Sequence, residues 1–174
     1  MRKEQIIETL KTAINPDQLR KIFRDLAFVC HPDCGGTNEI MRVLLEQYER
    51  ILRAFSGQTF HRRATNGEQT EYKYAYNETA ENEFTTCLQA AISTLPSDCT
   101  IEVRGSWIWL FGNTRPHKER IKSLGFNWKP SDSEWYWRSS DQRKKFHGYH
   151  AKTRDEIRAR YGAESHAGRQ QGVR

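Results

Sequence analysis

The side chains best suited to chemistry in the first third of this 174-residue chain are gathered in one short stretch. It runs Cys30-His31-Pro32-Asp33-Cys34-Gly35-Gly36. Two cysteines beside a histidine could suggest metal ligands, but a zinc site usually needs a second close pair, and Cys87 and Cys99 do not form one. We therefore interpret all four cysteines as reduced, partly buried thiols, and we predict no metal site.

Patterns typical of catalysis are missing from the rest of the sequence. It contains no P-loop and no Gly-x-Ser-x-Gly, and it lacks the clustered carboxylates that a nuclease or phosphatase would need. The remaining histidines are His61, His117, His147, His150 and His166. Only His147 and His150 have a ligand-like spacing, and they lie in a polar stretch. We predict that the protein is not an enzyme and uses no cofactor.

Three amphipathic helices are expected to position the His-Pro-Asp stretch. Apolar residues recur at helical spacing over residues 3–14, 17–29 and 38–55. In the first of these, Ile6, Ile7, Leu10 and Ile14 share one face. Pro32 and the two glycines after it must interrupt the helix, so the second and third helices favour an antiparallel hairpin. The first helix can cover one side of that hairpin, which gives a small helical domain over residues 1–56.

The helical hairpin resembles a known family. His-Pro-Asp between two helices, then Gly-Gly and a helix bearing Met41, Leu44, Leu45, Tyr48 and Leu52, resembles the J domain of DnaJ-type co-chaperones. The likeness covers about residues 15–56. It implies that the tripeptide stimulates ATP hydrolysis by a DnaK-type, seventy-kilodalton heat-shock chaperone. An ordinary proline turn, with an exposed histidine and a local turn at the aspartate, is the alternative.

The resemblance also implies how the tripeptide acts. Pro32 fixes its backbone and presents its neighbours rigidly outward. Asp33 can accept charge-assisted hydrogen bonds from an arginine of the partner, and His31 can donate or accept beside it. A protein that binds one conformational state of the chaperone better than another increases the population of that state. No residue of this chain therefore needs to be catalytic.

The family also carries a basic face on the helix before the loop, which this chain matches in part. The matching residues are Arg20, Lys21 and Arg24. Phe28 and Val29 stand where J domains commonly carry lysine or arginine. Cys30 and Cys34 stand in place of the usual aromatic residue and lysine. These departures leave open a specialised partner, or a degenerate J domain that serves as a scaffold.

The second half of the chain predicts a small antiparallel sheet with helices on one face, so the fold class is α+β. Residues 57–71 are interpreted as a linker or a loose hairpin. The module then spans residues 72–162, and its expected elements are strands at 72–76, 101–104, 107–111, 126–129 and 134–138, and helices at 78–95, 114–124 and 153–161. Residues 163–174 are expected to form a disordered basic tail.

The aromatic segments of this module resemble the C-terminal part of small J-domain-like proteins encoded by bacterial phages and plasmids. The residues that carry the likeness are Gly105-Ser106-Trp107-Ile108-Trp109, Gly112-Asn113-Thr114-Arg115-Pro116-His117-Lys118-Glu119, Leu124-Gly125-Phe126-Asn127-Trp128 and Trp135-Tyr136-Trp137. The resemblance covers about residues 72–161 and implies no activity. It indicates an origin in a mobile element.

Nucleic-acid binding is the alternative function. Trp107 and Trp109 share one face of a predicted strand and could stack bases, while nearby cations follow the phosphates. The candidate cations are Arg115, Lys118, Lys122, Lys144 and Lys145. Residues 142–174 hold nine lysines and arginines against three acids, which equals the net charge of +6 for the whole chain. The alternative interpretation of the basic tail is a solvated chain end. The alternative for the tryptophans is that one pair belongs to the core and the rest are partly exposed.

The remaining sequence features indicate the compartment. No apolar run approaches the roughly 18 residues that a membrane span needs. The first residues, Met1-Arg2-Lys3-Glu4, lead into an amphipathic helix and not into a signal-peptide core. We expect a soluble cytoplasmic protein without a membrane partner, located in a bacterial host if a phage or plasmid encodes it. Its expected partner is a DnaK-type chaperone or, in the alternative, a nucleic acid.

Overall fold

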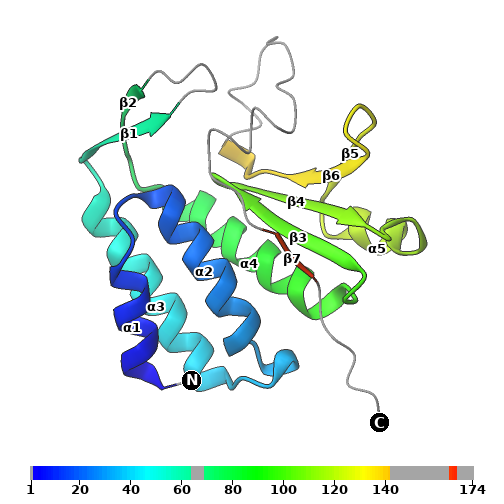
Figure 1. Ribbon diagram of the computed structural model, residues 1–174, viewed down its shortest axis with the longest axis horizontal. Coiled ribbons are helices and arrows are strands. Elements are labelled where there is room, and N and C mark those ends of the chain that lie inside the picture. The colour runs from blue at the N-terminus through cyan, green and yellow to red at the C-terminus, as the bar shows by residue number, and fades with distance from the viewer. Residues whose placement is uncertain (1, 64–68, 142–164, 168–174) are drawn as a thin grey trace.

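A helical hairpin forms the first part of the fold. The computed structural model describes residues 2–63, 69–141 and 165–167. Helix α2 (Pro16–Cys30) and helix α3 (Asn38–Phe55) lie side by side, and α1 (Lys3–Lys11) packs against both (Figure 1). Asn15 caps α2 by accepting the Gln18 N–H at 2.8 Å, and Thr37 caps α3 in the same way. The three predicted helices are therefore confirmed.

The first helix is shorter than predicted. It ends at Lys11, three residues before the expected end at residue 14. Ile14, which we placed on the buried face, is 75% exposed. Its backbone N–H donates to the side chain of Gln18 at 2.9 Å, so the chain has already turned toward α2 at this point.

The described residues on either side of 64–68 are two paired strands, which agrees with the hairpin, one of the two alternatives for this stretch. Strand β1 (Thr59–Arg63) pairs antiparallel with β2 (Gln69–Lys73). The strand predicted at residues 72–76 is wrong in its bounds, because β2 ends at Lys73. Tyr74 leaves the strand and is buried in the core, since the helices that follow offer it polar and apolar partners.

A five-stranded antiparallel sheet forms the second part of the fold. Its order is β5-β6-β4-β3-β7. The strands are β3 (Cys99–Arg104), β4 (Trp107–Gly112), β5 (Asn127–Lys129), β6 (Glu134–Trp137) and β7 (Ser165–Ala167). Helix α4 (Glu78–Thr94) precedes the sheet, and the 3-10 turn η2 (Arg115–His117) and helix α5 (Lys118–Ser123) connect β4 to β5. This arrangement confirms the α+β fold class.

The predicted disorder beyond residue 162 is wrong for Ser165–Ala167, which form β7 and pair antiparallel with Thr100–Glu102 of β3. Free backbone groups along that side of β3 provide hydrogen-bond partners that the composition of the tail does not reveal. The helix expected at residues 153–161 lies outside the described residues. No helix within the described ranges combines the length and apolar character that crossing a bilayer requires.

One core joins the two predicted domains. Helix α2 contacts both α4 and β3, and the buried apolar residues of the hairpin and the sheet belong to a single cluster. The inner face of the sheet contributes Ile101, Val103, Ile108, Leu110, Trp135 and Trp137 to it. The helical hairpin is therefore packed against the module along α2, with no free linker holding the two apart (Figure 1).

Candidate functional site

The tip of the α2–α3 hairpin is a tight, closed loop. His31 ends α2 and precedes a short 3-10 turn, η1 (Pro32–Cys34). The carbonyl of His31 accepts the N–H groups of Cys34 at 2.9 Å and Gly36 at 3.0 Å. A Cβ atom on Gly36 would lie 1.9 Å from the carbonyl oxygen of Cys30, so no larger residue fits there without a backbone shift. The loop is therefore held by its own backbone.

Within this loop, Pro32 and Asp33 are exposed, and the Asp33 side chain is 48% accessible. His31 differs from the expectation that it points outward, because its side chain is only 12% accessible. Its Nδ1 accepts the backbone N–H of Asp33 at 3.2 Å and lies 3.8 Å from the carboxylate. The histidine thus positions the backbone of Asp33, and the tip presents mainly the proline and the acid.

The basic face predicted on α2 is not on the surface. Arg20 is 5% exposed and Arg24 is fully buried, while Lys21 is half-buried. Arg24 donates to Asp25 at 2.8 Å, and Arg20 pairs with Glu81 of α4. Because α2 is covered by α1 and α3 on one side and by α4 and β3 on the other, its apolar stripe and both Arg20 and Arg24 are enclosed. The expected docking surface is therefore wrong for Arg20 and Arg24.

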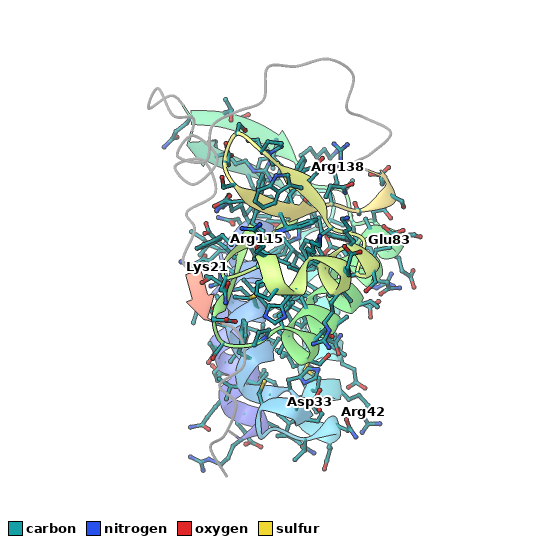
Figure 2. The ribbon with its side chains drawn as sticks, turned by 90° about the vertical axis from the view of Figure 1, so that its right-hand side faces the viewer. Lys21, Asp33, Arg42, Glu83, Arg115 and Arg138 are labelled. Carbon is teal, nitrogen blue, oxygen red and sulfur yellow. The ribbon has the colours of Figure 1, made fainter. Side chains whose placement is uncertain are left out.

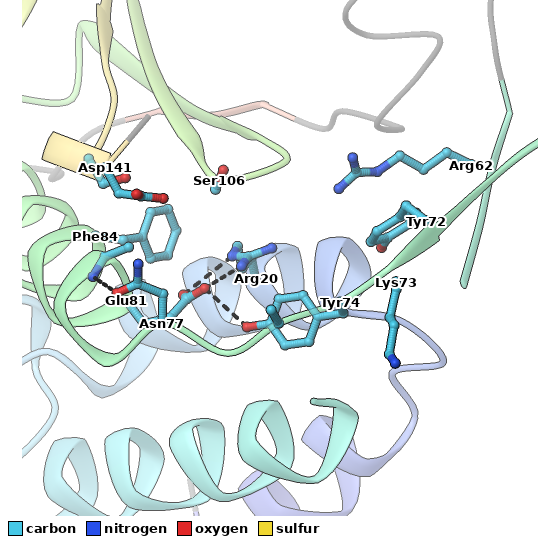
Figure 3. A pocket seen from close by; sticks show the side chains of 13 residues that line it. Arg20, Arg62, Tyr72, Lys73, Tyr74, Asn77, Glu81, Phe84, Ser106 and Asp141 are labelled. Carbon is cyan, nitrogen blue, oxygen red and sulfur yellow. Dashed lines mark hydrogen bonds and ion pairs between the residues drawn. The ribbon is translucent and has the colours of Figure 1, made fainter. Parts of the chain in front are cut away.

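The buried Glu81 collects four polar contacts at this seam. Both a terminal nitrogen and Nε of Arg20 donate to it, the latter at 3.4 Å. The hydroxyls of Tyr48 and Tyr74 donate at 3.0 and 3.3 Å. Figure 3 shows Arg20 and Tyr74 converging on the carboxylate. Burial opposes the charge of Arg20, but the nearby Glu81 carboxylate holds its pKa well above the ordinary value.

A cavity of about 180 Å³ opens beside this network. Its lining comes from both parts of the fold and includes Arg62, Tyr72, Ser106 and Ser139 (Figure 3). Arg62 is already paired, because it donates to Asp17 at 2.7 and 3.0 Å. The cavity is also lined by Lys73 and Asp141, so cations and acids lie side by side around it and largely offset one another.

The aromatic surface predicted to stack bases, Trp107 and Trp109, is largely covered by other side chains. Trp107 and Trp109 do share the outer face of the sheet, but Trp109 is only 2% exposed. The two rings stack on each other with centroids 5.9 Å apart, and the Arg104 guanidinium lies 4.6 Å from the centroid of Trp109. Arg104 itself is buried and donates to Glu102 at 2.7 Å and to Glu134 at 2.8 Å. These contacts occupy the ring surfaces that a base would need.

The candidate cations for nucleic-acid binding lie partly within and partly outside the described residues. Arg115, Lys118 and Lys122 are exposed, but Glu119 lies between the two lysines at 3.8 and 3.7 Å. Lys144 and Lys145 lie outside the described residues. The described part of the chain therefore offers only a short and partly neutralised basic segment.

Comparisons with known proteins identify no relative of the helical hairpin or of the sheet module. No protein-family model, curated protein or solved structure matches this chain. The J-domain resemblance therefore stays a prediction that depends on the residues of the tip.

Sequence reasoning missed one group of side chains. Asp98, Cys99 and His117 come together where β3 begins and where the chain leaves β4, with one potential ligand atom from each within 4.8 Å of the others. Burial and the charge of Asp98 raise the pKa of the Cys99 thiol to about 11. The register that pairs Cys99 with Gly112 brings them together. His117 follows the last residue of β4, Gly112, by one short turn.

Proposed function

We propose that this protein is a J-domain-like co-chaperone or adaptor that engages a DnaK-type ATPase through the tip of the α2–α3 hairpin. The observation that carries the proposal is the exposure of Pro32 and Asp33 on a loop that its own backbone holds rigid. A carboxylate fixed in this way loses little conformational freedom when it accepts hydrogen bonds from an arginine of the partner. The C-terminal sheet module would then bind the client or target.

The position of the tip supports this role. Asp33 and Arg42 lie at one end of the molecule, while Arg138 of the sheet module lies at the other (Figure 2). Near the tip, Val29 is 52% exposed on the last turn of α2. A partner could therefore contact an acid, a proline and an apolar side chain together without meeting the sheet.

The buried arginines limit how the partner binds. Arg20 and Arg24 are engaged inside the fold, so they cannot steer a chaperone along α2 as a basic face would. We propose a contact confined to the tip, which fits a specialised chaperone better than the common bacterial one. Asp33 then carries most of the electrostatic contact between this protein and the chaperone.

Single-turnover ATP hydrolysis by a purified bacterial DnaK-type chaperone tests the proposal. The wild-type protein should accelerate hydrolysis, and Asp33→Asn should reduce the acceleration about tenfold, since a charge-assisted bond contributes about 1.5–3 kcal/mol. His31→Gln should also reduce it, because the histidine fixes the backbone of Asp33. Glu119→Gln, an exposed acid on α5, is the matched control and should change nothing. The absence of acceleration by the wild type with several such chaperones would refute the proposal.

Nucleic-acid binding through the start of α5 is a second candidate, favoured by the exposure of Arg115, Lys118 and Lys122 on one short segment. Binding to single- and double-stranded DNA and RNA should then weaken with salt, because bound cations release counterions from the phosphates. Replacing both lysines with alanine should lower the salt dependence of binding. An affinity that does not respond to salt would remove this candidate.

A further inference from the structure

Asp98, Cys99 and His117 offer one carboxylate, one thiol and one imidazole at a single point of the fold. The His117 Nε2 lies 4.0 Å from an Asp98 carboxylate oxygen, and all three potential ligand atoms lie within 4.8 Å of one another. Across the part of the chain that the structure describes, this is the one group of three such residues close enough to share an ion.

The backbone holds two of these residues in a fixed frame. Cys99 is the first residue of β3 and is directly opposite Gly112, the last residue of β4. Asn113 donates its backbone N–H to the carbonyl of Asp98 at 3.0 Å and its side-chain amide to the Asp98 Oδ2 at 2.7 Å. Gly112 has φ +92°, and a Cβ there would lie 2.6 Å from the Asp98 carbonyl oxygen. The close approach therefore requires glycine.

The same contacts leave one carboxylate oxygen available. Because the Asn113 amide binds Oδ2 of Asp98, the other oxygen, Oδ1, faces His117. The histidine is the last residue of η2, and its backbone N–H donates to the carbonyl of Thr114 at 3.0 Å. The hydrogen bond from the Asn113 amide to Asp98 is of the kind that orients a metal-binding carboxylate from outside the ligand set.

The burial of the three side chains suits an ion that enters from one side. Cys99 is fully buried, while the side chains of His117 and Asp98 are 25% and 47% accessible. The thiol thus forms the floor of the site, and the imidazole and carboxylate form its rim. The Cys99 Sγ currently donates a weak hydrogen bond to the Asn113 carbonyl at 3.5 Å.

We propose that Asp98, Cys99 and His117 bind a Zn²⁺ ion, with water in the fourth position. Sulfur, nitrogen and oxygen donors together suit Zn²⁺, whereas Mg²⁺ and Ca²⁺ select oxygen ligands alone. Tetrahedral bonds of about 2.0–2.3 Å place ligand atoms roughly 3.3–3.8 Å apart, so atoms that now lie within 4.8 Å of one another need to approach by at most about 1.5 Å. Binding forms a sulfur–zinc bond and releases the thiol proton to solvent.

Titration of the whole protein with Co²⁺, after removal of metal by a chelator, tests the site. The wild type should bind one equivalent and show the sulfur-to-cobalt charge-transfer band and the intense visible bands of a tetrahedral site. Zn²⁺ should displace the cobalt and abolish both signals. An unbuffered Zn²⁺ titration should release one proton per ion bound.

Variants decide whether these three residues are the ligands. His117→Gln and Asp98→Asn alter accessible side chains and should each weaken Co²⁺ binding at least tenfold. Cys99→Ser should remove the charge-transfer band. Cys34→Ser is the matched control, since this half-buried cysteine lies at the hairpin tip, and it should leave the spectrum unchanged. A wild type without the sulfur band, or a band that survives His117→Gln and disappears in Cys34→Ser, would overturn the proposal.

Discussion

Charged side chains are buried near the start of helix α2 and exposed just beyond its end. Near its start, Arg20 is buried and paired with Glu81 of α4, and at its middle Arg24 is buried and paired with its neighbour Asp25. Just beyond its end, Asp33 is half exposed on a rigid loop. Arg20 therefore joins two parts of the fold through Glu81 at the base of the helix, whereas the half-exposed acid lies at the tip. The contact proposed above for a partner is placed at the tip.

The largest expected effect is at the base. Glu81→Ala removes the carboxylate that Arg20, Tyr48 and Tyr74 share, and it leaves the buried guanidinium of Arg20 with the weaker ion pair to Asp17 at 3.4 Å. The free energy of unfolding should fall by about 3–5 kcal/mol, because an incompletely paired buried charge is costly. Urea unfolding followed by tryptophan fluorescence measures it.

The matched control at an exposed acid is Glu119→Gln, which should change the free energy of unfolding by less than about 0.5 kcal/mol. A loss below about 1 kcal/mol in Glu81→Ala would mean that the base is not held by its charges, and the contrast with the tip would fail.

The next effect is at the loop itself and compares two neighbouring glycines. Gly36→Ala should destabilise the protein by about 2 kcal/mol or more, because its Cβ meets the Cys30 carbonyl. Gly35 has φ +96° with open space around it, so Gly35→Ala should cost only about 1 kcal/mol. Thermal unfolding of both variants gives the order, and equal losses would contradict the close approach.

A smaller effect is the alkaline loss of stability at the base. Burial, and then the charge of Glu81, raises the pKa of Tyr48 well above its ordinary value of 10.0. The unfolded chain therefore loses this proton first, and the contribution to stability is complete below pH 10 and is lost as the pH rises above it. Between pH 9 and pH 11, Tyr48→Phe should lose about 1 kcal/mol less than the wild type in urea unfolding. Parallel losses in both proteins would exclude this contribution.

The smallest expected effect on folding is at the tip. Asp33→Asn should leave the free energy of unfolding within about 0.5 kcal/mol of the wild type, because its carboxylate is half exposed and close only to His31. The same variant should weaken acceleration of the chaperone ATPase, so function and stability separate at this residue. A large loss of stability in urea unfolding would show that Asp33 holds the loop.

Periodicity predicted the helices and strands well, because each part of the fold buries a regular apolar pattern. Asn15, Thr37 and Asn77, residue types that favour the start of a helix, cap α2, α3 and α4. Errors arose where tertiary contacts override local pattern, as at Ile14, which is exposed because the chain turns early.

The candidate site was harder to predict than the fold. A helical pattern shows which residues share a face, but not whether a second layer will cover that face, so Arg20 and Arg24 were placed on the surface. The outward His31 was wrong for a similar reason, since its contact with the Asp33 N–H is a detail of the loop. Asp98, Cys99 and His117 were missed because only the strand register brings them together.

The pairing of β7 with β3 covers a strand edge that would otherwise be open to a second chain. Backbone N–H and C=O groups along an open strand form a template on which another chain can add. Ser165–Ala167 occupy that template along Thr100–Glu102. A chain shortened before Ser165 would leave one side of β3 uncovered, and two such chains could join edge to edge through it.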